Sequence, residues 1–228
     1  VWHHHGQMSE AFRTVMFLSA SCGLQDAYTY IGRGKVFANA QTGNIVLMSQ
    51  AAFDGDLARV LHYLIPLLSF ALGVAVAEAI HIRYREAKRL HWRQLVLLVE
   101  ILLLFGVGFI PNTLDLAANA LVSFACAMQV QAFRKVHSYP FASTMCIGNM
   151  RSGMESLVVY FHLHDKKVLH KALHYFGVIL LFAIGAGVGA HCVGVFGNKT
   201  IWFSCALLLV SLCFMFIQDE EEALKEKA

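Results

Sequence analysis

Long runs of apolar residues, separated by short charged stretches, are the dominant pattern of this chain of 228 residues. The uncharged stretches include 60–77, 101–113, 177–197 and 201–217. A membrane-spanning helix needs about 20 mostly apolar residues, so these stretches predict transmembrane helices or large parts of them. The pattern predicts eight apolar segments, which are Ala11–Tyr30, Val36–Phe53, Val60–Ile82, Trp92–Ile110, Leu114–Phe133, Phe141–Leu163, Val168–Val195 and Thr200–Ile217. The sequence therefore predicts an all-α, polytopic membrane helix bundle.

The segments form two sets of four that resemble each other, which predicts an internal repeat. The tripeptide Leu-His-Tyr begins at Leu61 and again at Leu173, and five further positions at matching spacings carry identical residues. We assign repeat 1 to residues 8–112 and repeat 2 to residues 113–217, within one membrane domain. The flanking residues 1–7 resemble an expression-tag remnant, and residues 218–228 form a charged cytoplasmic tail.

A polar motif interrupts the second and sixth segments. The first copy, FANAQTGN, occupies residues 37–44, and the second, FASTMCIGN, occupies residues 141–149. Hydrocarbon cannot hydrogen-bond amide and hydroxyl groups, and each unsatisfied group costs several kcal/mol. A broken helix also frees backbone groups that can bind ions. The duplicated break therefore predicts a site, and a helix kink satisfied by neighbouring side chains is the structural alternative.

The distribution of basic residues favours six full spans over eight. If both interrupted segments are broken or re-entrant, thirteen Lys and Arg residues lie on the cytoplasmic side and four lie outside. If all eight segments span, the division is ten and seven. The positive-inside rule favours the first arrangement, with both termini cytoplasmic. That arrangement makes the two halves inverted copies, and eight spans remain the alternative.

Two acids stand out against the apolar background. Asp26 lies near the end of the first span, and Glu100 lies near the middle of the fourth and has no acidic counterpart in the second half. Acids inside a membrane usually face a cavity or a partner, and burial favours a protonated carboxyl that can switch. We expect one of them to carry a coupling proton or cation. The alternatives are an ion pair of Asp26 with Arg33 or Lys35, and a neutral structural hydrogen bond for Glu100.

The candidate substrate or ion site combines these acids with polar residues of both interrupted segments. It comprises Asp26, Asn39, Gln41, Thr42, Gly43, Asn44 and Glu100 from the first half, and Gln129, Asn149 and Arg151 from the second. Arg151 and Glu155 are four residues apart, so an ion pair on one helix face is the alternative for that arginine.

Composition and charge exclude several classes of function. Charged residues make up 14% of the chain, against roughly 25% in soluble domains. The net charge of +3 implies no nucleic-acid partner. The six cysteines lie in apolar segments without a CxxC pair, which is typical of buried thiols. The histidines lack a completing cysteine or carboxylate cluster, so we expect no metal, and no motif predicts a cofactor or an enzyme.

The first half of the chain contains GLQDA at residues 23–27, then Phe37 and Asn39, and then the Thr-Gly-Asn group at residues 42–44. Together these residues resemble the opening signature of the YoaK-like (DUF1275) family. The resemblance extends over nearly the whole chain in length and segment order. The chain departs from the signature by an extra residue before Thr42 and by Ile147 in place of the threonine before the second Gly-Asn. The resemblance implies a multi-pass protein of the bacterial inner (plasma) membrane and little about a substrate.

The sequence leads to one principal functional hypothesis. We expect a small secondary transporter or permease for a small solute, coupled to a proton or cation, with its site between the two broken Gly-Asn segments. The alternatives are a channel built on inverted repeats and a non-catalytic membrane scaffold. The expected partners are the lipid bilayer and a small-molecule or ion substrate, and a bundle of this size is compatible with a homo-oligomer.

Overall fold

The structure is a computed structural model that describes residues 4–84, 92–133 and 146–225, with side chains described for residues 14–84, 92–133 and 146–216. Within these residues every regular element is a helix, which confirms the all-α prediction. The elements are α1 (His4–Gly32), α2 (Gln41–Phe53), α3 (Leu57–Tyr84), α4 (Trp92–Val107), η1 (Asn112–Leu114), α5 (Asp115–Ala132), α6 (Cys146–Leu163), α7 (Lys166–Phe196), η2 (Gly197–Thr200) and α8 (Ile201–Lys225).

The second predicted segment is interrupted, and the interruption lies before Gln41 instead of at Gly43. Residues 36–40 form an irregular loop, and the helix begins only at Gln41. The reason is visible in the loop's hydrogen bonds, which go to side chains instead of continuing a helical ladder: Asp26 and Asn44 hold the backbone of Asn39 and Phe37. The sixth predicted segment is described from Cys146 onward, and its residues 141–145 lie outside the described residues.

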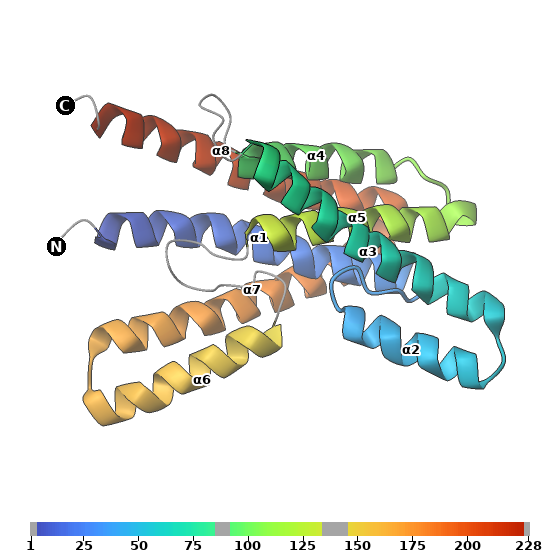
Figure 1. The fold of residues 1–228 in the computed structure, drawn as a ribbon, viewed down its shortest axis with the longest axis horizontal. Helices are drawn as coiled ribbons and strands as arrows, with labels where there is room; N and C mark the ends of the chain where they lie inside the picture. Colours follow the sequence, from blue (N-terminus) through green and yellow to red (C-terminus); the bar gives the residue numbers. More distant parts are fainter. Residues whose placement is uncertain (1–3, 85–91, 134–145, 226–228) are drawn as a thin grey trace.

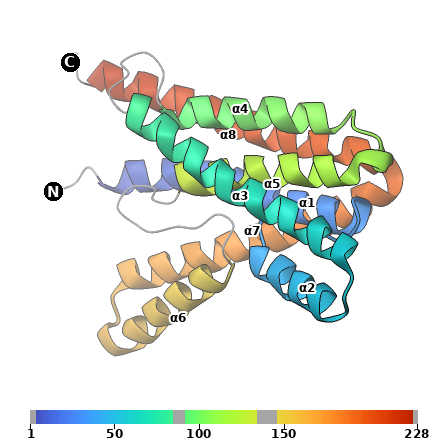
Figure 2. The same ribbon diagram turned by 45° about the vertical axis from the view of Figure 1, so that its right-hand side comes forward.

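Helices α1 and α5 run through the middle of the bundle, α4 and α8 lie together along one margin, and α3 and α7 cross it (Figures 1 and 2). Helix α1 packs mainly against α7 and α8, α5 packs mainly against α3 and α4, and α4 also packs against α8. The two helices that contain or follow the polar breaks lie at the periphery, α2 against α3 and α6 against α7. The turn between α2 and α3 lies at one end of the molecule, and the turn between α6 and α7 lies at the other (Figures 1 and 2).

The exterior is apolar and the interior carries much of the polarity, which is the arrangement expected in lipid. Large aliphatic side chains stand exposed along α3 and α7, among them Leu68, Leu72, Leu180 and Ile184. Soluble proteins rarely expose contiguous apolar surface of this kind. Three stretches of the described residues are long and apolar enough to cross a membrane: Leu57–Tyr84, Asn112–Ala132 and Lys166–Phe216, the last comprising α7, η2 and most of α8. The chain is a membrane protein.

Small residues bring helices into backbone contact at two crossings. A Cβ atom added at Gly185 of α7 would lie 2.0 Å from the carbonyl oxygen of Ala20 on α1, and one at Gly23 would lie 2.0 Å from that of Phe182. At the second crossing, a Cβ atom on Gly73 of α3 would lie 2.4 Å from the carbonyl oxygen of Phe124 on α5. Lipid supplies no hydrophobic drive for helices to associate, so such close packing is a main source of stability.

We expect Gly185→Ala to destabilise the protein, because the new methyl group meets a backbone oxygen that cannot turn away. Overpacking of this kind costs about 1–3 kcal/mol. Gly187→Ala is the matched control on the same helix, since a Cβ atom there meets nothing within 4 Å. That control should be neutral or slightly stabilising, because Ala is the better helix former. Thermal unfolding of the detergent-solubilised variants measures both effects, and equal melting temperatures would contradict the crossing.

Candidate functional site

A cluster of buried polar side chains occupies the centre of the bundle, and we call it the polar core. Its members are Ser21, Cys22 and Gln25 of α1, Glu100 of α4, Cys126 and Gln129 of α5, and Ser204 of α8. Each of the three residues Gln25, Glu100 and Gln129 has an exposed fraction of 0%. These side chains come from both halves of the chain, so the polar core exists only once the halves are packed together.

Gln25 is the hub of the polar core. Its amide nitrogen Nε2 donates to Ser204 Oγ at 2.9 Å, to Ser21 Oγ at 3.1 Å and, with a longer contact, to Glu100 Oε1 at 3.4 Å. Ser21 and Ser204 are themselves 2.6 Å apart between their hydroxyl oxygens. One amide therefore joins α1 to α4 and α8. Sequence reasoning left Gln25 out of the predicted site.

Two Cys-x-x-Gln pairs bond across the centre. The thiol of Cys126 donates to Gln25 Oε1 at 2.6 Å, and Gln129 Nε2 donates to the sulfur of Cys22 at 2.9 Å. Each cysteine lies three residues before its glutamine, which puts both on one face of their helix. The repetition of Cys-x-x-Gln at residues 22–25 and 126–129 is the sequence signal that would have identified Gln25.

Glu100 has few polar contacts for so buried an acid. Its Oε1 accepts the long hydrogen bond from Gln25, and its Oε2 has no hydrogen-bond partner among the described residues. Its helix neighbours Leu97 and Leu104 are fully buried and apolar. The predicted site residue Glu100 therefore lies at the heart of the bundle, linked through Gln25 to the second half.

Asp26 and Asn39 meet beside the polar core. Asp26 Oδ1 accepts a hydrogen bond of 2.7 Å from the backbone N–H of Asn39, and Asn39 Nδ2 donates to the carbonyl oxygen of Cys22 at 3.3 Å. The acid thus anchors the loop before α2 to α1. The alternative of an ion pair with Arg33 is wrong, because that arginine pairs with Asp115.

The other residues of the first polar break stabilise the loop itself. Asn44 is fully buried, accepts from the backbone N–H of Phe37 at 2.9 Å and donates to its carbonyl oxygen at 2.7 Å and to Gln41 Oε1 at 2.9 Å. Gln41 donates to the carbonyl oxygen of Ala38 at 2.7 Å. Gly43 leaves room for the ring of Phe37, since a Cβ atom there would lie 2.8 Å from it. This break is a folded loop whose polar groups are largely satisfied by one another.

The remaining predicted site residues, Thr42, Asn149 and Arg151, differ in their exposure. Thr42 is exposed at the start of α2. On α6, Asn149 is buried, with an exposed fraction of 2%, whereas Arg151 is exposed and pairs with Glu155 at 2.8 Å. The ion-pair alternative for Arg151 is therefore the observed one. The structure brings Asp26, Asn39, Glu100 and Gln129 together around α1, and Gln41, Gly43 and Asn44 form the adjoining loop.

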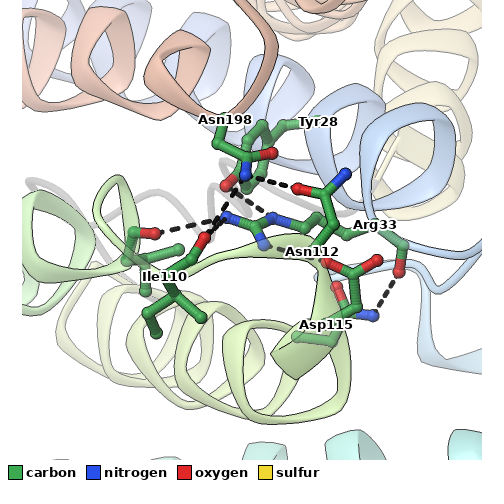
Figure 3. A network of polar contacts seen from close by, with 8 residues as sticks. Tyr28, Arg33, Ile110, Asn112, Asp115 and Asn198 are labelled. Carbon is green, nitrogen blue, oxygen red and sulfur yellow. Dashed lines mark hydrogen bonds and ion pairs between the residues drawn. The ribbon is translucent and has the colours of Figure 1, made fainter.

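A second polar cluster closes one end of the bundle, and we call it the Arg33 cluster (Figure 3). Arg33 is fully buried, and its guanidinium bonds Asp115 Oδ1 at 2.8 Å, the hydroxyl of Tyr28 at 2.8 Å and the carbonyl oxygen of Ile110 at 2.8 Å. It also contacts the carbonyl oxygen of Val107 at 3.3 Å. The Arg33 side chain contacts all of these partners, and it therefore joins the end of α1 to the end of α4 and the start of α5.

Asn119 and Asn198 add further contacts to the Arg33 cluster. Asn119 of α5 donates to the carbonyl oxygen of Arg33 at 2.6 Å. Asn198 of η2 donates to the carbonyl oxygen of Ile110 and to the side chain of Asn112 (Figure 3). The chain segments that leave α1, α4 and α7 are thus fastened together at this end.

We expect Arg33→Met to lower the free energy of unfolding by about 3 kcal/mol, because Asp115 loses its ion-pair partner in a partly buried setting and the buried hydroxyl of Tyr28 loses its contact with the guanidinium. Arg59→Met is the control: Arg59 is about half exposed and pairs with Asp56 at 3.3 Å, and such surface pairs contribute about 0–1 kcal/mol. Thermal or denaturant unfolding in detergent compares the two, and equal losses would refute a structural role for the cluster.

We expect Asn44→Leu to destabilise the loop before α2, because the backbone N–H and carbonyl of Phe37 lose their partners at a cost of about 1–3 kcal/mol each. Thr42→Val, two residues away and exposed, should leave stability unchanged. Limited proteolysis of the loop and the melting temperature report the difference. If the threonine variant were the more damaging one, the loop would not be held in the way described.

Comparison with known proteins agrees with this architecture. The family model described as "Protein of unknown function (DUF1275)" matches residues 14–214. The chain is also 26% identical over 209 residues to "UPF0700 transmembrane protein YoaK" of Bacillus subtilis (strain 168), which covers 87% of this chain and 92% of that protein. No solved structure gives a significant match. Because the family model covers most of its length, the chain belongs to the DUF1275 family of membrane proteins.

Proposed function

We propose that this protein is a small secondary transporter for a small solute, coupled to a proton or a cation, whose site lies at the polar core beside the broken segments. The observation that carries the proposal is the polar core itself: fully buried amide, thiol, hydroxyl and carboxyl groups from both halves meet inside an apolar bundle. Polar and ionisable residues inside a membrane are costly and commonly mark substrate or ion pathways. We assign no catalytic role to any of them.

The helix contacts support a repeat architecture with two related halves. Each helix of α1–α4 has a counterpart four helices later in α5–α8, and the contacts follow this correspondence. The α1/α7 contact corresponds to α5/α3, the α1/α8 contact to α5/α4, and the α2/α3 contact to α6/α7. All six of these helix pairs are packed. Many secondary transporters are built from two such repeats, with the site at the interface between them.

The crossing residues obey the same exchange. Gly73 and Gly185 each follow the tyrosine of their Leu-His-Tyr tripeptide by ten residues. Their contacts, Phe124 and Ala20, each precede the cysteine of their Cys-x-x-Gln pair by two residues. Equivalent residues thus make equivalent contacts at the two crossings, which supports a two-fold relation between the halves.

We also propose that the chain crosses an inner (plasma) membrane six times, with both termini in the cytoplasm. Helix α2 has 13 residues, or about 20 Å at 1.5 Å per residue, which falls short of a hydrocarbon layer of about 30 Å. The first turns of α1 and the last turns of α8 lie at the same end of the molecule (Figures 1 and 2). Three full spans in each half give the halves opposite orientations, and the basic residues favour the end that carries both termini as cytoplasmic.

The polar core fits a carrier better than an open pore. Its side chains are bonded to one another and fully buried, so the described state is closed at this level. The Arg33 cluster closes the end that the proposed orientation assigns to the outside. Alternating access would then require the pairs α1/α7 and α3/α5, each built from both halves, to move relative to one another.

We expect Glu100→Gln to abolish gradient-driven accumulation of solute by reconstituted protein while leaving exchange of solute across the membrane. The amide keeps the size of the side chain and cannot release a proton, so transport loses its coupling. Solid-supported membrane electrophysiology on proteoliposomes, with pools of metabolites applied under a proton or a sodium gradient, measures coupled transport, and uptake of the same pools in isotope-labelled form into preloaded proteoliposomes measures exchange. Glu155→Gln, an exposed acid on α6, is the matched control and should behave as the unmodified protein.

Two results would overturn the transporter. Unmodified protein that gives no solute-evoked current with any pool under either gradient would remove the basis for it. Stepwise single-channel currents in planar bilayers would instead assign the protein to the channels.

A further inference from the structure

We propose that Glu100 is a proton-binding group, that it carries its proton in the conformation described here, and that Gln25 reports its protonation state to the second half of the protein. The role in coupling rests on the proposed transporter function and makes the coupling ion a proton instead of sodium. Whether the Glu100 side chain carries a proton is a separate property, which can be measured without any substrate.

The first argument is burial without a counter-charge. Glu100 has an exposed fraction of 0%, and its one described hydrogen bond is the 3.4 Å contact from the Gln25 amide. Its second oxygen, Oε2, has no partner within the described part of the chain. No Lys, Arg or His of that part forms an ion pair with it. An isolated carboxylate in such surroundings is strongly disfavoured, so the carboxyl group keeps its proton.

The neighbouring titratable groups act in the same direction. Cys126 on α5 and Cys205 on α8 face Glu100, and neither thiol supplies the positive charge that an ionised carboxylate would need. Asp26 is already held by the backbone N–H of Asn39, which suits it to anchor the loop. Glu100 has only the long contact from Gln25, so of the two acids it is the one that we assign to proton binding.

The orientation of Gln25 argues against a sodium ion at this position. The thiol of Cys126 donates to Gln25 Oε1, which turns the Nε2 donor toward Glu100, Ser21 and Ser204. Hard cations need several oxygen acceptors pointing inward, and an N–H donor in that shell repels them. The geometry fits a protonated acid that still accepts one hydrogen bond.

The same hydrogen bonds give loss of the proton a structural consequence. Hydrogen bonds to an ionised carboxylate are shorter and roughly twice as strong as those between neutral groups. An ionised Glu100 would therefore draw the amide of Gln25 toward α4. The amide would then give up its contact with Ser204 on α8 and its acceptor would leave Cys126 on α5, so deprotonation would loosen α1 from the second half.

Infrared titration of the detergent-solubilised protein tests the proton directly. We expect the unmodified protein to show the carbonyl stretch of a buried protonated carboxyl group at neutral pH, and Glu100→Gln to lose that band. Asp26→Asn should retain it, and so should Glu155→Gln, which alters an exposed acid. If Glu100→Gln does not fold, Gln25→Met supplies a second test: the band should persist and shift to higher wavenumber, because the carboxyl loses its hydrogen bond.

Three outcomes would overturn the proposal. The band could be absent from the unmodified protein at neutral pH, it could disappear in Asp26→Asn and not in Glu100→Gln, or sodium chloride could abolish it where choline chloride does not. The last result would assign a sodium ion to the carboxylate. Because none of these measurements uses a transported solute, a failed proton assignment is distinguishable from a failed transporter proposal, which the electrophysiology decides alone.

Discussion

The structure depends on the requirement that polar groups inside a membrane find their partners within the protein. Gln25 meets this requirement by bonding three helices at once, and neither a single helix nor a single half could supply its partners. The hydrogen bonds that satisfy the amide also specify how the helices are packed, since lipid is as apolar as the surrounding side chains and gives no direction of its own. The hydrogen bonds of the buried polar groups therefore also determine how the helices of this bundle are arranged.

The two polar clusters serve the bundle in different ways. At the Arg33 cluster, the guanidinium is bonded to a carboxylate, a hydroxyl and two carbonyl oxygens. Such a complete set of partners is typical of a structural fastening. The polar core is less complete, because Oε2 of Glu100 lacks a partner among the described residues. Incomplete satisfaction of a buried network is tolerated chiefly where function requires it.

The Gly-Asn motif of the first half acquires a different meaning from the one its sequence suggested. Asn44 and Gly43 shape the turn around Phe37, and Asp26 fastens that turn to α1. The motif therefore mainly shapes the loop that lies beside the polar core. Residues that a signature brings together are often the ones that hold a loop in position, because an irregular backbone in a membrane must be satisfied locally.

The sequence by itself determined the helical class, the membrane environment and the presence of a buried acid at Glu100, because hydrophobic run length and charge are local properties that survive any rearrangement of the helices. It also predicted an interruption of the second segment, although it placed the break at Gly43, which lies inside α2, and the irregular residues are 36–40. It missed Gln25 and assigned Arg33 the wrong alternative partner, since Asp115 is far away in sequence. Only the tertiary structure decided which polar residues meet, because that depends on helix crossings where a missing Cβ atom permits contact.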